Sequence, residues 1–98
     1  MMSRRVVVTG MGMLTALGAS VDKTWAGILA GKSGIRAIDH FDPAAFSTQF
    51  AGMVPDFVVE DYLPAKEARR VDAFIQYGLA AGQQALIDSG LVVTDANA

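Results

Sequence analysis

The chain has 98 residues, of which 52% are hydrophobic, so a single domain is expected and a disordered tail is excluded. Eight Lys and Arg against ten Asp and Glu leave a net charge of −2, which excludes a general basic surface for nucleic acid. No cysteine is present, so these residues contain no disulfide, no cysteine-ligated metal and no cysteine nucleophile.

The amino terminus places two arginines before an apolar run. Arg4 and Arg5 precede Val6–Val8, a β-branched triplet that predicts a strand buried on both faces, as in parallel sheets covered by helices. Basic residues followed by an apolar run are also typical of a secretory signal, but glycines and threonines between Thr9 and Thr15 interrupt the apolar stretch. We therefore expect a cytoplasmic protein. No run reaches the roughly 18 apolar residues of a membrane span, so no membrane partner is expected.

Gly10-Met11-Gly12 follows the predicted strand and is similar to the opening of a dinucleotide-binding fingerprint. Thr15 stands where the third glycine belongs, and no helix starts directly after it. We interpret the glycines as a tight turn and expect no cofactor. A dinucleotide-binding unit remains the alternative at this point.

The next predicted helix spans Val21 to Ala30, with Ser20 as its N-cap and Gly31 as its stop. Ile35 to Ser47 is predicted to be a loop. His40 lies in this loop without a second histidine nearby, so we interpret it as an ordinary loop side chain and predict no metal site.

Further along the chain, Phe50 to Val54 predicts a strand on a sheet margin that ends at Pro55. Glu60 to Leu63 predicts one helical turn before Pro64.

The longest predicted element is a continuous helix from Ala65 to Ser89, with Gly90 at its C′ position. No charged residue lies between Asp72 and Asp88, which is typical of a helix buried on several sides. Gly78 and Gly82 predict that another backbone packs closely against it.

A doubly buried strand and a buried helix need covering layers that 98 residues do not supply. We therefore expect an α/β chain that is the amino-terminal piece of a larger layered protein.

Three cations follow a long acidic stretch. From Ala37 to Ala65 the chain has no Lys or Arg, and then Lys66, Arg69 and Arg70 come within five residues. On a continuous helix these three side chains project within about 100° of one another. From the residues alone they are interpreted as a solvated helix face.

Several segments, in order and with matching spacing, resemble the start of the β-ketoacyl-acyl-carrier-protein synthase II family, the elongating condensing enzymes of bacterial fatty acid synthesis. These segments are Arg4 to Gly12, Gly31 to Ile35, Asp39 to Asp42, Phe50 to Gly52 and Asp72 to Gly78. The resemblance implies that residues 1–98 are the incomplete amino-terminal segment of a thiolase-like α-β-α-β-α fold. It covers essentially the whole chain.

The resemblance also implies the reaction. Members of the family pass an acyl group from acyl carrier protein to a cysteine, then condense it with malonyl-carrier protein as carbon dioxide is lost. None of their catalytic groups matches a residue of this chain, so we predict no catalytic, cofactor-binding or metal-binding residue and expect these 98 residues to be inert alone.

Lys66, Arg69 and Arg70 match the basic patch with which the family receives acyl carrier protein, so the resemblance implies docking there. It implies a homodimer as well. Two alternatives remain: a non-catalytic module that binds carrier protein, and a ketosynthase domain of a polyketide pathway.

Overall fold

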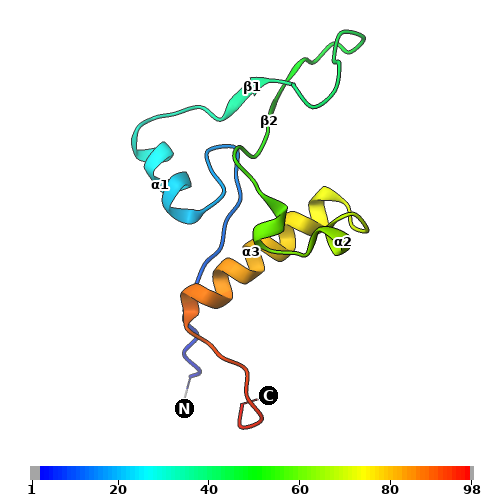
Figure 1. The fold of residues 1–98 in the computed structure, drawn as a ribbon. Helices are drawn as coiled ribbons and strands as arrows, with labels where there is room; N and C mark the ends of the chain where they lie inside the picture. Colours follow the sequence, from blue (N-terminus) through cyan, green and yellow to red (C-terminus); the bar gives the residue numbers. More distant parts are fainter. Residues whose placement is uncertain (1–2, 98) are drawn as a thin grey trace.

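The computed structural model describes residues 3–97, in which helices and two short strands follow one another along the chain (Figure 1). The elements are α1 (Val21–Leu29), β1 (Ile35–Ala37), β2 (Phe50–Gly52), the 3₁₀ turn η1 (Val59–Asp61), α2 (Ala65–Ala68) and α3 (Ala73–Ser89). No helix among these residues is long and apolar enough to cross a membrane.

Helix α3 is the longest element and runs obliquely through the middle of the described chain (Figure 1). The β1–β2 hairpin projects as an arm at one end, and both chain termini lie at the other (Figure 1). The radius of gyration is 17.4 Å, against about 13 Å for a compact domain of about 100 residues. The described residues therefore do not close around a core of their own.

Helix α1 forms as its caps predict. The side chain of Ser20 accepts a hydrogen bond from the backbone N–H of Lys23 at 3.2 Å, and Gly31 takes a left-handed φ of +68° after the last turn. These two positions satisfy groups that helix ends leave unpaired. The predicted helix is confirmed, one residue shorter than expected.

The hairpin arm was predicted in part. β2 confirms the strand expected from Phe50, but it pairs antiparallel with β1, which lies inside the predicted loop. Ile35 is opposite Gly52, and Ala37 is opposite Phe50. A three-residue strand carries too little periodicity to be recognised, because its partner, distant in sequence, is what defines it.

The predicted turn before Pro64 is present as η1, which starts and ends one to two residues earlier than expected.

The predicted continuous helix from Ala65 to Ser89 is wrong, because the chain breaks between α2 and α3. Asp72 is extended, with φ −72° and ψ 163°, and serves as the N-cap of α3. Aspartate favours such caps over helix interiors because its short polar side chain competes with the helical backbone bonds. Gly90 ends α3 in the left-handed conformation, as predicted.

The predicted strand at Val6–Val8 is absent from the described chain, where this segment has no strand beside it. Val6 is 90% exposed and Val8 is 79% exposed. A strand needs partners for its backbone groups, and residues 3–97 contain none for this segment.

Little apolar surface is buried. Among the described residues, the buried hydrophobic side chains are those of Ala68 and Ala80, whereas Phe74 and Ile87 on α3 are 72% and 79% exposed. A Cβ atom added at Gly78 or Gly82 meets nothing within 4 Å. The close packing predicted for these two glycines is therefore not made by the described residues.

We predict that the 98-residue chain, expressed alone, self-associates or stays poorly folded, because its apolar surface has no cover. Analytical ultracentrifugation and thermal denaturation test this prediction. A monodisperse monomer with one cooperative thermal transition would contradict it.

Candidate functional site

Gly10 and Gly12 lie against the side of α3. A Cβ atom at Gly12 would overlap the carbonyl oxygen of Ala81 and would come within 2.8 Å of its carbonyl carbon, and one at Gly10 would come within 2.5 Å of the backbone nitrogen of Ser89. The two glycines thus allow two backbones to approach each other. The predicted tight turn lies later, where Thr15 and Gly18 exchange backbone hydrogen bonds of 2.9 and 3.2 Å.

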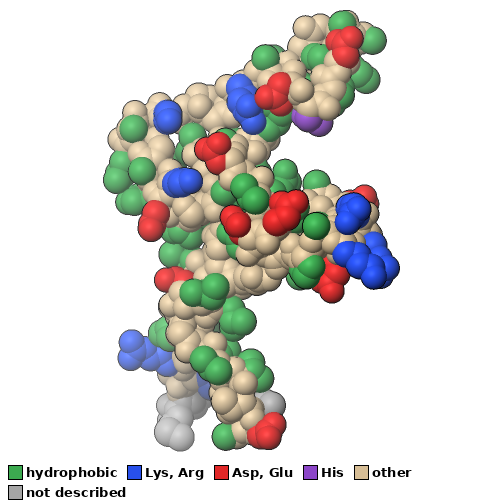
Figure 2. All heavy atoms as spheres, viewed as in Figure 1, with side chains coloured by type: hydrophobic (Ala, Val, Ile, Leu, Met, Phe, Trp, Pro, Cys, Tyr) green, Lys and Arg blue, Asp and Glu red, His purple; other side chains and the backbone are tan. Residues whose placement is uncertain are grey.

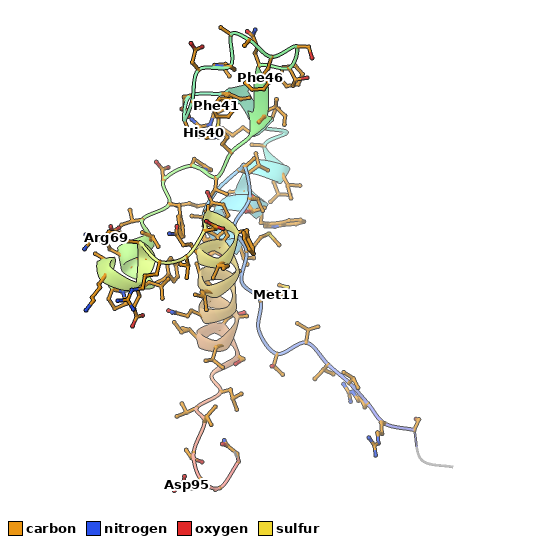
Figure 3. All side chains as sticks on the ribbon, turned by 90° about the vertical axis from the view of Figure 1, so that its right-hand side faces the viewer. Met11, His40, Phe41, Phe46, Arg69 and Asp95 are labelled. Carbon is orange, nitrogen blue, oxygen red and sulfur yellow. The ribbon has the colours of Figure 1, made fainter. Side chains whose placement is uncertain are left out.

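Polar side chains of α3 hold this segment in place. Asp88 Oδ2 accepts a hydrogen bond from the backbone N–H of Met11 at 3.0 Å, and Gln84 Oε1 accepts one from that of Met13 at 2.9 Å. In Figure 3, Met11 lies beside the body of α3. The glycines therefore face the flank of a helix, and not the helix N-terminus at which dinucleotide phosphates bind.

The three candidate docking residues lie together at the corner between α2 and α3. Lys66 is in α2, Arg69 is its C-cap and Arg70 follows directly; all three are exposed. Figure 2 shows their cationic groups gathered at one protruding edge of the molecule, and Figure 3 shows Arg69 at the outer side of α2. The helical spacing predicted for them is wrong because α2 ends at Ala68, yet the cluster itself is present.

Within the described part of the chain, the charges of this cluster are not neutralised by ion pairs. The ion pair found in residues 3–97 joins Arg36 to Asp39 at 3.0 Å, far along the chain in the hairpin arm. With Glu67 counted, the three cations leave a local charge of +2. Such an exposed cluster is suited to attract an acidic partner through long-range electrostatics.

A cluster of three aromatic rings joins the residues around η1 to α3. The ring of Phe57 stacks on Tyr62 with centroids 5.9 Å apart and meets Tyr77 edge-on at 5.0 Å. The Tyr62 hydroxyl accepts a hydrogen bond from Gln84 Nε2 at 2.9 Å. Residues next to η1 are thereby connected to α3 and to the amino-terminal segment.

Comparison with known proteins assigns the family. The family model described as beta-ketoacyl synthase, N-terminal domain, matches residues 3–98. The chain belongs to the beta-ketoacyl synthase family. The resemblance found from its sequence motifs is thus confirmed.

Individual relatives agree with this family. The chain is 57% identical over 98 residues to 3-oxoacyl-[acyl-carrier-protein] synthase 2 of Vibrio harveyi and 58% identical to that of Vibrio cholerae, covering all of this chain and 24% of each relative. It is 43% identical over 88 residues to the chloroplastic 3-oxoacyl-[acyl-carrier-protein] synthase I of Hordeum vulgare, covering 90% of this chain and 19% of that protein. The chain therefore spans about a quarter of the length of the bacterial relatives.

A solved structure shows the same fold. The solved structure of the ishigamide ketosynthase/chain length factor matches with a TM-score of 0.79 and 37% identity over 91% of this chain and 22% of that one. The open arrangement of the described residues is thus similar to that of about a fifth of the matched ketosynthase chain.

Catalytic groups of a ketosynthase are not evident in the described part of the chain. Cysteine is absent from the sequence, and His40 is an exposed residue of the hairpin arm. Its Nδ1 lies 3.3 Å from Met53 Sδ, and its ring meets Phe41 edge-on at 4.7 Å. No group of three metal-ligating side chains occurs within residues 3–97.

We predict that Gly12→Ala destabilises the protein by about 1–3 kcal/mol, because the added methyl group overlaps α3. Gly52→Ala is the matched control, since its Cβ would lie 3.3 Å from Ala16 Cβ and 3.5 Å from Ile35 Cδ1, and it is expected to cost much less. Urea denaturation measures both variants. Equal stability of the Gly12 variant, or micromolar NAD or ATP binding that Gly12→Ala abolishes, would contradict this packing role.

Proposed function

We propose that this chain is the amino-terminal segment of a longer condensing enzyme that elongates acyl-acyl carrier protein with malonyl-acyl carrier protein. The observation that carries the proposal is the identity of 57–58% over all 98 residues to two proteins named 3-oxoacyl-[acyl-carrier-protein] synthase 2. The match of the family model across residues 3–98 supports it.

The exposed surface supports a longer protein. Large apolar side chains of the amino-terminal segment and of α3 are uncovered, among them Val6, Phe74 and Ile87. In the proposed thiolase-like α-β-α-β-α fold, the rest of the enzyme covers them and supplies strands beside Val6–Val8. Residues 1–98 are then an incomplete part of a domain.

The proposed reaction is a decarboxylative Claisen condensation. A cysteine thiolate beyond this segment takes the acyl group from its carrier thioester and releases the carrier thiol. Malonyl-carrier protein then loses carbon dioxide, and the electron pair left on its α-carbon attacks the acyl-cysteine thioester. The carbon–carbon bond forms as the cysteine thiolate leaves, and the product is a β-ketoacyl thioester on carrier protein.

The segment itself contributes core structure and docking. We propose that Lys66, Arg69 and Arg70 receive the acidic carrier protein, in both its acyl-loaded and its malonyl-loaded form. Exposed charges of this kind steer the encounter and orient the partner, and salt screens them. We also propose that the whole enzyme is a cytoplasmic homodimer and needs no cofactor.

The proposed activity is tested on the full-length protein. Acyl- and malonyl-carrier protein are expected to give a β-ketoacyl product with one carbon dioxide released per turnover, whereas the 98-residue chain gives none and forms no covalent acyl adduct by mass spectrometry. A full-length protein that binds carrier protein but releases no carbon dioxide would support a non-catalytic binding module instead. Activity only with polyketide extension substrates would favour a polyketide ketosynthase.

For docking, we predict that the full-length double variant Arg69→Glu, Arg70→Glu has an apparent KM for carrier-protein substrates that is about 5- to 30-fold higher, from the loss of two exposed charge contacts. Repulsion from the acidic partner adds to this at low salt. Activity with a small thioester substitute stays nearly unchanged, because the distant chemistry is untouched. Steady-state kinetics at several salt concentrations measures both.

The matched control is Lys23→Glu, Lys32→Glu, which changes the net charge equally at exposed positions in and just after α1. It is expected to leave KM for carrier-protein substrates nearly unchanged. An unaltered KM in the arginine variant at low ionic strength would refute docking at this corner, and an equal loss with both substrates would indicate damaged folding.

A further inference from the structure

One side-chain amide links α3 to the corner that carries the three cations. Gln76 lies in the first turn of α3, and its Nε2 donates hydrogen bonds to the carbonyl oxygen of Ala68 at 3.0 Å and to that of Val71 at 3.4 Å. Ala68 is the last residue of α2 and is only 6% exposed. One glutamine therefore ties both the end of α2 and the connecting residues to α3.

Apart from those of Gln76, the hydrogen bonds at this corner are local ones within α2, its end and the first turn of α3, such as that from Arg70 N to Glu67 O at 3.0 Å. The backbone bond from Val71 N to Ala68 O is 3.5 Å long, and the N-cap Asp72 makes no side-chain capping bond. Helix α2 has four residues, too few to be stable by itself in water. Its orientation thus depends on what holds it from outside, which is Gln76 together with contacts to η1.

We propose that Gln76 is a positioning residue for docking, one that sets the orientation of Lys66, Arg69 and Arg70 towards an acidic protein partner. This inference rests on the proposed function. Gln76 is half-buried beneath the corner and acts through α2. Long-range attraction tolerates small shifts of charge, but the bound complex needs the cations in register with the partner's carboxylates.

The test uses Gln76→Met in the full-length enzyme. Methionine keeps the length of the side chain and a good helix propensity but removes both donated bonds. The loss of one or two hydrogen bonds predicts an apparent KM for carrier-protein substrates about 3- to 10-fold higher. The kcat value and the kinetics with a small thioester are expected to stay unchanged.

The matched control is Gln83→Met. Gln83 is on the same helix, is half-buried like Gln76, and donates one bond to the carbonyl oxygen of Tyr62 at 3.0 Å, away from the carbonyls of α2. This control distinguishes a general loss of stability from a displacement of the cations at the α2–α3 corner. A similar rise in KM in this control, or an equal loss of Gln76→Met activity with both substrates, would overturn the positioning role.

A double-mutant cycle tests whether Gln76 acts through the cations. Lys66 suits the cycle because its side chain makes no hydrogen bond or ion pair with residues 3–97. If Gln76 positions it, Lys66→Ala raises KM less in the Gln76→Met background than in the wild type. Equal effects in both backgrounds would overturn the inference.

The two proposals fail in distinguishable ways. If the Arg69, Arg70 reversal leaves KM unchanged, docking at this corner is refuted, and the positioning role falls with it. If the reversal raises KM but Gln76→Met does not, docking stands and only the role of Gln76 is refuted.

Discussion

The described structure depends on the close contact between the amino-terminal segment and α3. Gly12 brings its backbone against the helix, where a Cβ atom would overlap the carbonyl of Ala81. Gln84 then uses both ends of its amide, accepting from the Met13 N–H and donating to Ala19 O and Tyr62 Oη. These hydrogen bonds of the partly buried Gln84 amide join segments that the small apolar core does not hold together.

The rest of the arrangement follows from this contact. The amino-terminal segment lies along the side of α3. Helix α1 and the hairpin arm lie on one side of α3, and α2 lies next to its first turn (Figure 1). The remaining faces of α3 are apolar and open. The described residues therefore leave much of α3 unpacked, while polar bonds specify the local geometry where the amino-terminal segment meets it.

The charged side chains are unevenly distributed over the surface. The chain is acidic overall, but three of its eight Lys and Arg residues gather at the protruding α2–α3 corner (Figure 2). A protruding cluster projects its field into solvent, while the neighbouring Glu67 and Asp72 reduce its net charge. Under the proposed function, this segment contributes recognition of a charged partner while the covalent chemistry is carried by another part of the enzyme.

The sequence by itself determined the family, the capped helix α1, the left-handed end of α3 at Gly90 and the presence of the cationic cluster, because caps, glycine conformations and charge runs are local properties. Three features were decided by the tertiary structure alone. Gly10 and Gly12 pack against the backbone of α3, β1 pairs with β2, and the helix breaks before Asp72. Each of these depends on groups distant in sequence. A long apolar pattern does not reveal that a side chain such as Gln76 will bond across a helix break, since that bond exists only once both elements are placed.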